Sequence, residues 1–309
     1  MSVDKLCEKI IERQNPSVVG LDPVLSYIPQ AIKDEMRAAH QNPFEAAAQS
    51  LLAFNQAIID EIADVVPAVK PQIAFYEMYG WQGVRAYHET VEYAKKRGLY
   101  VIGDIKRGDI GSTAEAYAIG HMGRPDLFGE ARAAFDTDAV TVNPYLGSDG
   151  ILPFARLCKG KKMIFVLAKT SNQSSGEYQD QVTTSGETIY QLAASNMERL
   201  GESHMGACGY SDVGIVVGAT YPAMLGELRE RVPHTFFLVP GYGAQGGGGA
   251  DAAPAFDSRG LGAIVNSSRG IICAWQKGGS DGRDFAKAAR EAAIRMREDL
   301  LGVLGGKIG

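Results

Sequence analysis

The sequence has 309 residues, of which 45% are hydrophobic, and a formal net charge of −5 at pH 7. This length can bury either one large α/β domain or two smaller ones. The acidic balance leaves no excess of Lys and Arg to neutralise phosphates, which excludes nucleic-acid binding as the main task. No apolar run reaches the length of a membrane span, and residues 1–12 lack the apolar segment of a signal peptide. We therefore expect a cytoplasmic protein without a membrane partner.

In chain order, short runs rich in β-branched residues alternate with longer segments of helical period, which is typical of repeated βα units. Eight such runs predict a single (β/α)8 TIM barrel domain over residues 1–309. The runs are residues 18–21, 68–70, 100–104, 139–142, 163–167, 213–217, 235–239 and 263–266.

Two long helices are predicted in some detail. Asn42 and Pro43 give a cap and a first-turn proline, and apolar residues recur at helical spacing from Phe44 to Ile62. Near the C-terminus, Asp284 is a possible cap for a last helix whose apolar stripe ends at Leu304. We expect this helix to close the ring.

Charged residues gather where the second and third predicted strands end. Asp104 and Lys106 are two residues apart, so their side chains are expected to point the same way, into the barrel mouth. Lys70 ends the neighbouring strand, and Asp109 follows in the loop after Lys106. Such an alternating charge array is costly to desolvate, which favours a catalytic role. An ion-pair network that only stabilises the barrel rim is the alternative.

Two glycine-containing loops follow the seventh and eighth predicted strands. The first runs from Pro240 through Gly241, and glycines fill residues 246–249. The second holds Ser268 and Arg269. Backbone amides of such loops bind phosphate in many barrels, and an arginine binds it through two parallel hydrogen bonds. A phosphorylated small ligand is predicted, although a glycine run alone also fits a plain turn.

Metal and disulfide sites are not expected. The four cysteines form no CxxC pair, and the five histidines show no HxxxH or HxxE spacing.

Together these segments resemble the orotidine 5′-phosphate decarboxylase family, and specifically its longer bacterial (type 2) subgroup. The resemblance covers nearly the whole chain and rests on five segments in order: Leu21-Asp22-Pro23, Lys70-Pro71-Gln72, the Asp-x-Lys-x-x-Asp of residues 104–109, the glycine-rich residues 240–247, and Ser267-Ser268-Arg269. It implies decarboxylation of orotidine 5′-monophosphate to UMP without a metal or organic cofactor, in pyrimidine biosynthesis.

The resemblance also implies a role for each catalytic residue. Lys106 is the proton donor, Asp104 and Asp109 flank it, and Lys70 completes the array. Asp109 and Thr113 reach the ribose bound by a neighbouring subunit, which implies a homodimer with shared active sites. A lysine ammonium held by fixed carboxylates suits this reaction, since it stabilises a carbanion and then protonates it.

The remaining implied contacts bind the nucleotide. Asp22 and Lys70 bind ribose hydroxyls, and Ser171 recognises the pyrimidine edge. The other substrate-binding residues belong to the two glycine loops and are Pro240, Gln245, Ser268 and Arg269. Of these, Gln245 and Arg269 hold the phosphate.

Some features leave alternatives open. The chain is longer than most of the family, with expected insertions near residues 24–41 and 172–212. They make Ser171 the least secure assignment, and a role as a helix cap or turn residue is its alternative. A Mg²⁺-dependent sugar-phosphate decarboxylase of the same superfamily shares the Asp-x-Lys-x-x-Asp motif. It would need an acidic metal ligand where this chain has Lys70. A non-catalytic nucleotide-binding relative is the third alternative.

Overall fold

The computed structural model describes residues 1–243, 246–278 and 281–309. Eight parallel strands close into a barrel in which β10 pairs with β1. Every predicted run is one of its strands, so the predicted barrel is confirmed. In barrel order the strands are β1 Ser17–Leu21, β2 Ala68–Pro71, β3 Tyr100–Arg107, β6 Ala139–Val142, β7 Met163–Lys169, β8 Ser211–Val217, β9 Thr235–Pro240 and β10 Ala263–Ser267.

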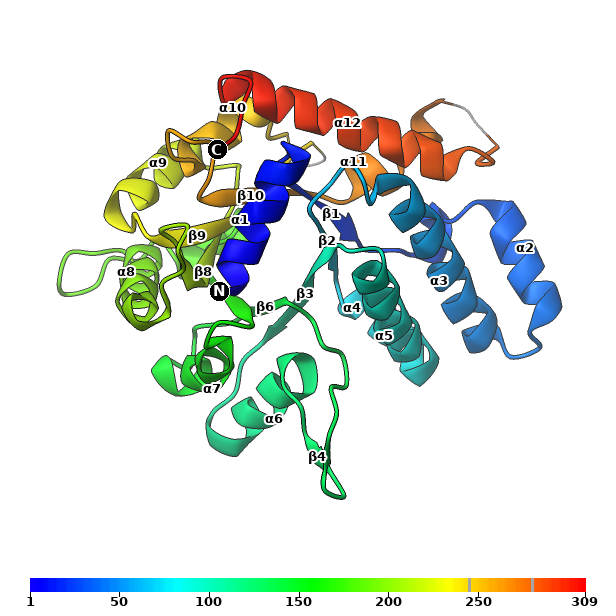
Figure 1. Cartoon of the computed structure of the whole chain (residues 1–309), viewed down its shortest axis with the longest axis horizontal. Coiled ribbons are helices and arrows are strands. Elements are labelled where there is room, and N and C mark those ends of the chain that lie inside the picture. Colours follow the sequence, from blue (N-terminus) through cyan, green and yellow to red (C-terminus); the bar gives the residue numbers. More distant parts are fainter. Residues whose placement is uncertain (244–245, 279–280) are drawn as a thin grey trace.

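Helices surround this barrel (Figure 1). Their apolar faces pack against the outward side chains of the strands and form the larger core cluster. The longer helices are α3 Pro43–Ile62, α5 Gly80–Lys96, α6 Gly111–Met122, α7 Ser148–Cys158, α8 Ile189–Gly201, α9 Pro222–Arg231 and α12 Phe285–Val303. The single turns are α4 Ala74–Glu77, α10 Gly249–Ala252 and α11 Arg269–Ile272.

The two helix starts predicted from sequence have different outcomes. The side chain of Asn42 accepts a hydrogen bond from the amide of Phe44 at 2.9 Å, so the predicted cap of α3 is confirmed. Helix α12 begins at Phe285 as predicted, but the side chain of Asp284 makes no capping hydrogen bond. Asp284 has φ −100° and ψ 19° instead of extended backbone, and the prediction of a carboxylate cap is wrong.

A second core cluster fills the barrel interior and its N-terminal end. Helix α1, Ser2–Arg13, lies across that end (Figure 1). Its residues Val3, Leu6 and Ile10 are completely buried, in the same cluster as Phe165 and Phe236 of the barrel interior. Polar strand ends are therefore free to form a site only at the opposite, C-terminal end.

Further elements interrupt the βα alternation. Residues 24–41 form η1, Leu25–Tyr27, and α2, Gln30–Ala39, which packs against α3. Residues 172–212 contain η2, Gln173–Glu177, then α8 and η3, Glu202–His204. A hairpin of β4, Asp126–Leu127, and β5, Glu130–Ala131, was not predicted. The remaining short turns are η4 Ala253–Ala255 and η5 Ala274–Gly278. In the described part of the chain, no helix combines the length and apolarity needed to cross a bilayer.

Candidate active site

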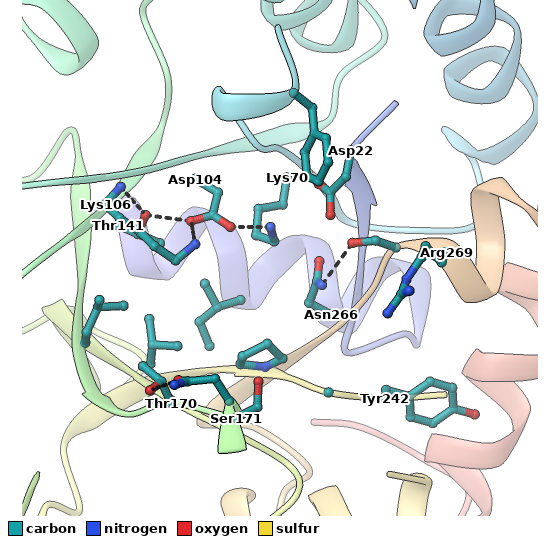
Figure 2. Close-up of a pocket in the computed structure, with 18 of the residues that line it drawn as sticks. Asp22, Lys70, Asp104, Lys106, Thr141, Thr170, Ser171, Tyr242, Asn266 and Arg269 are labelled. Atoms are coloured by element: carbon teal, nitrogen blue, oxygen red, sulfur yellow. Dashed lines mark hydrogen bonds and ion pairs between the residues drawn. The ribbon is translucent and has the colours of Figure 1, made fainter. Parts of the chain in front are cut away.

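A cavity of about 650 Å³ opens at the C-terminal ends of the barrel strands. Figure 2 shows side chains from opposite sides of the barrel converging on it. Most of the predicted site residues line this cavity: Asp22, Lys70, Asp104, Lys106, Ser171, Pro240, Ser268 and Arg269.

Asp104 lies between two lysine side chains at the centre of one wall (Figure 2). Its Oδ2 is 2.6 Å from the Nζ of Lys70, and its Oδ1 is 2.6 Å from the Nζ of Lys106. Lys70 and Asp104 are buried, whereas 44% of the Lys106 side chain is exposed toward the cavity. The array therefore presents one accessible ammonium group, held in place by a buried carboxylate.

The ionisation of this array follows from its geometry. Burial alone would raise the pKa of Asp104, but the ammonium groups of Lys70 and Lys106 outweigh burial and hold this pKa far below its usual range. Burial would also lower the pKa of Lys70, but the carboxylates of Asp104 and Asp22 raise it above the ordinary value. Both residues of the pair are charged at neutral pH.

The backbone at Lys106 departs from a regular strand. Lys106 has φ 45°, in the left-handed region, and the pairing of β3 with β6 shifts register between Gly103 and Arg107. The expectation that Asp104 and Lys106 both point into the barrel mouth is confirmed. The irregular backbone between them was not predicted.

The wall formed by β1 and β10, next to Lys70 on β2, contains buried polar atoms without partners. Oδ1 of Asp22 and Oδ1 of Asn266 are buried and accept no hydrogen bond within the described chain. Asn266 is the second-last residue of β10 and lies close to β1, since a Cβ on Gly20 would lie 3.1 Å from the Asn266 side-chain oxygen. Unsatisfied buried acceptors facing a cavity are well suited to bind hydroxyl donors of a ligand.

An exposed arginine marks one edge of the cavity. Arg269 begins the short helix α11, and its side chain is exposed and makes no hydrogen bond or ion pair with the described residues. Ser268 precedes it and also lines the cavity. The predicted phosphate ligand Gln245 lies outside the described residues.

Ser171 lies beside the end of β8. A Cβ on Gly218 would come within 2.8 Å of the Cβ of Ser171, so the glycine permits this close approach. The neighbouring Thr170 is fixed by Gln179, whose side chain exchanges hydrogen bonds of 2.8 and 2.9 Å with it. Gln179 comes from the predicted insertion and also lines the cavity.

Two predicted site residues do not line the cavity of their own chain. Oδ1 of Asp109 accepts a hydrogen bond from the amide of Ile110 at 2.8 Å, and Thr113 is exposed on α6. A single chain thus brings together Lys70, Asp104 and Lys106 without Asp109. The role implied for Asp109 and Thr113 in a neighbouring subunit stays a prediction.

The residues that line the cavity and were not assigned to it from the sequence include the polar side chains of Thr141, Gln179 and Asn266. Asn266 is the last residue of the eighth predicted run, so its position at a strand end was a usable signal. Thr141 lies inside a β-branched run and Gln179 lies in an irregular insertion, where no pattern distinguishes them. Within the described residues, no group of three His, Cys, Asp or Glu side chains is placed to hold a metal ion.

Comparison with known proteins gives full-length matches. The family model described as "Orotidine 5′-phosphate decarboxylase / HUMPS family" matches residues 48–278. The chain is 43% identical to orotidine 5′-phosphate decarboxylase of Rhodopirellula baltica, covering 95% of this chain and 96% of that protein. It is 40% identical to the same enzyme of Clostridium novyi, with coverages of 96% and 98%.

A solved structure agrees with these sequence matches. OMP decarboxylase of Leishmania donovani superposes with a TM-score of 0.71 at 29% identity, covering 96% of this chain and 98% of that one. The resemblance drawn from the motifs is confirmed. This chain belongs to the orotidine 5′-phosphate decarboxylase family.

Proposed function

We propose that this cavity converts orotidine 5′-monophosphate to UMP and CO2, and that Lys106 delivers the proton that replaces the carboxylate. The observation that carries this proposal is the Lys106 ammonium, which is exposed to the cavity and lies 2.6 Å from the buried carboxylate of Asp104. Family membership supports the reaction, which belongs to pyrimidine biosynthesis.

The chemistry requires a fixed positive charge. When the bond between the ring carbon and the carboxylate breaks, its electron pair stays on that carbon in the plane of the ring, where the π system delocalises it poorly. The Lys106 ammonium stabilises this charge and transfers one proton to the carbon. The resulting neutral amine regains a proton from solvent, which its partial exposure allows. Atoms and charge balance without an oxidant or a reductant.

The donor set at Asp104 does not fit a divalent cation. Both carboxylate oxygens already accept hydrogen bonds, Oδ2 from Lys70 and Oδ1 from Lys106. A cation bound there would lie against two ammonium groups, and Lys70 replaces the acidic ligand that the Mg²⁺-dependent alternative needs. We therefore propose a reaction that uses no metal or organic cofactor.

The rest of the cavity suits a nucleotide. The unpartnered oxygens of Asp22 and Asn266 accept hydrogen bonds from ribose hydroxyls, and Lys70 supplies a donor beside them. Arg269 and Ser268 bind the phosphate at the edge. We assign the pyrimidine to the side lined by Ser171 and Pro240.

We also propose a homodimer in which Asp109 and Thr113 serve the partner's site. Apolar side chains around them are exposed in the single chain: Ile110 by 54%, Tyr145 by 84% and Leu146 by 47%. The loop of Tyr145 lies beside that of Asp109, since a Cβ on Gly150 would lie 3.0 Å from the Asp109 carbonyl. An apolar surface of this kind favours burial against a partner. Four free cysteines favour the reducing cytoplasm that we assign to the protein.

The first prediction tests the proton donor and the cofactor-free reaction. We expect the purified protein to form UMP from orotidine 5′-monophosphate at the same rate with and without EDTA. Lys106→Ala removes the proton donor and is expected to lower kcat by at least about 10³-fold, since charge stabilisation and proton transfer are both lost. UMP formation measured by chromatography, with UMP affinity and the thermal midpoint as folding controls, checks both. Loss of activity in EDTA, or near-normal turnover by a folded Lys106→Ala, would refute the proposal.

A further inference from the structure

Thr141 makes three hydrogen bonds to the bulged segment of β3. Its Oγ1 accepts from the backbone amides of Ile105 and Lys106, each at 3.0 Å, and donates to Oδ1 of Asp104 at 2.8 Å. Thr141 is 1% exposed, and Figure 2 shows it beside Asp104 and Lys106. One hydroxyl therefore contacts every residue of the segment 104–106.

The strand pairing explains why a hydroxyl is needed there. Gly103 pairs with Val140, and the next pair is Arg107 with Val142. Between these pairs β3 has residues 104–106, whereas β6 has only Thr141. The amides of Ile105 and Lys106 consequently have no strand carbonyl opposite them, and the Thr141 side chain replaces the missing acceptor.

The hydroxyl has no spare hydrogen-bonding capacity. A threonine oxygen has two lone pairs and one proton. The two amides occupy the lone pairs, so the proton can only point toward Oδ1 of Asp104. This single arrangement fixes the orientation of the carboxylate and the backbone of Lys106 together.

Lys106 needs this support because its backbone is strained. A non-glycine residue with φ 45° is disfavoured by the contact between its Cβ and the backbone. The amide of Lys106 is held by Thr141, and its ammonium is held by the same Asp104 oxygen that receives the Thr141 proton. Without the hydroxyl, the backbone amide of Lys106 would lose its hydrogen bond. The Asp104 carboxylate that binds the Lys106 ammonium would lose the hydrogen bond that orients it.

We propose that Thr141 is a positioning residue that sets where the Lys106 ammonium lies relative to the reacting carbon. The proposal rests on the role of Lys106 proposed above. Thr141 takes no part in proton transfer, and its effect falls on the rate of the bound substrate and not on nucleotide affinity.

The test compares variants that keep or remove the hydroxyl. Thr141→Val has nearly the same shape without the hydroxyl, Thr141→Ser keeps it, and Thr141→Ala avoids a methyl group against the two amides. We expect Thr141→Val and Thr141→Ala to lower kcat by about 10²-fold, the loss that a misplacement of about 1 Å produces. Their KM and UMP affinity should change by less than about 3-fold, and Thr141→Ser should recover kcat to within about 5-fold of wild type.

Thr137→Val is the matched control. Thr137 is also buried, and its hydroxyl donates to the carbonyl of His121 at 2.9 Å, but it does not line the cavity. We expect this variant to lower the thermal midpoint without changing kcat. Thr141 is excluded as a positioning residue if Thr141→Ser is as slow as Thr141→Val, or if the slow variants lose UMP affinity in proportion to kcat. Activity in Lys106→Ala would instead refute the proton donor, so the two failures are distinguishable.

Discussion

At the scale of single residues, charge is distributed unequally across the cavity. The ammonium groups of Lys70 and Lys106 are both paired with Asp104. Arg269 has no carboxylate partner among the described residues, so its guanidinium is free for a ligand. Under the proposed function, we therefore expect the substrate phosphate to bind the guanidinium of Arg269 at the edge of the cavity.

The second prediction concerns this phosphate contact. We expect Arg269→Ala to lower kcat/KM for orotidine 5′-monophosphate by about 10- to 100-fold, because a hydrogen bond to a charged group contributes about 1.5–3 kcal/mol. Orotidine, which lacks the phosphate, should be affected less than about 2-fold. Steady-state kinetics on both substrates checks this. Arg295→Ala, exposed on α12, is the control for loss of an arginine; equal losses on both substrates in Arg269→Ala would contradict the phosphate role.

At the scale of elements, the sequence predicts regular structure well and irregular structure poorly. β-branched runs predicted all eight barrel strands because burial on both faces demands such residues. The charged residues could be predicted because few charges occur at strand ends. The bulge at 104–106 could not, since it depends on how β3 pairs with β6. The contribution of Thr141 was hidden for the same reason.

The third prediction belongs to this scale and concerns the attachment of α1 to β8. The buried Asp212 accepts a hydrogen bond from the amide of Val3 at 2.7 Å, and its other oxygen has no partner. Burial raises the pKa of Asp212 from 3.8 to about 6; the hydrogen bond from Val3 and the Met1 ammonium oppose this, and Asp4 adds to it. The folded state therefore binds a proton more tightly than the unfolded state, and stability from this group is lost as pH rises from about 4 to about 6.

Asp212→Asn should remove this loss. The amide oxygen can still accept from Val3, and no charge has to be buried. Above pH 7 we expect the variant to be more stable than wild type by about 1–3 kcal/mol, since one pKa unit corresponds to about 1.4 kcal/mol. Below pH 4 the difference should vanish. Urea unfolding across this pH range checks it, with the exposed Asp34→Asn as the control for lost charge; a constant difference at all pH values would contradict the explanation.

At the scale of the whole molecule, the single chain has an incomplete set of the predicted site residues. The barrel could be predicted from the βα alternation. The position of Asp109 and Thr113 relative to another subunit could not, because patterns within one chain do not show contacts between chains, and neither residue lines the cavity of its own chain. The dimer was implied only by resemblance. The exposed apolar side chains near Asp109 now give it a physical argument.

Shared sites make the last prediction quantitative. Lys106→Ala and Asp109→Ala should each be nearly inactive alone. After subunit exchange in an equal mixture, half of the dimers are hybrids, and each hybrid has one complete site. We expect about a quarter of wild-type activity per chain, from random pairing in a two-fold dimer. The measurement is the activity after mixing, and the molar mass of each variant in solution shows whether it is a dimer. If both variants are dimers and the mixture recovers no activity, the proposal of shared sites is contradicted.

The position of α1 also determines how molecules enter and leave. Val3, Leu6 and Ile10 close the N-terminal end of the barrel, and the same core cluster fills the interior as far as Val216 and Leu238, which line the cavity. Under the proposed function, we therefore expect substrate and both products to use the same mouth in the described part of the chain. CO2 is small enough to leave past a bound nucleotide, but UMP has to vacate the mouth before the next substrate enters. If the proposed reaction takes place here, we expect accumulating UMP to compete with the substrate, because the closed N-terminal end offers the product no second exit.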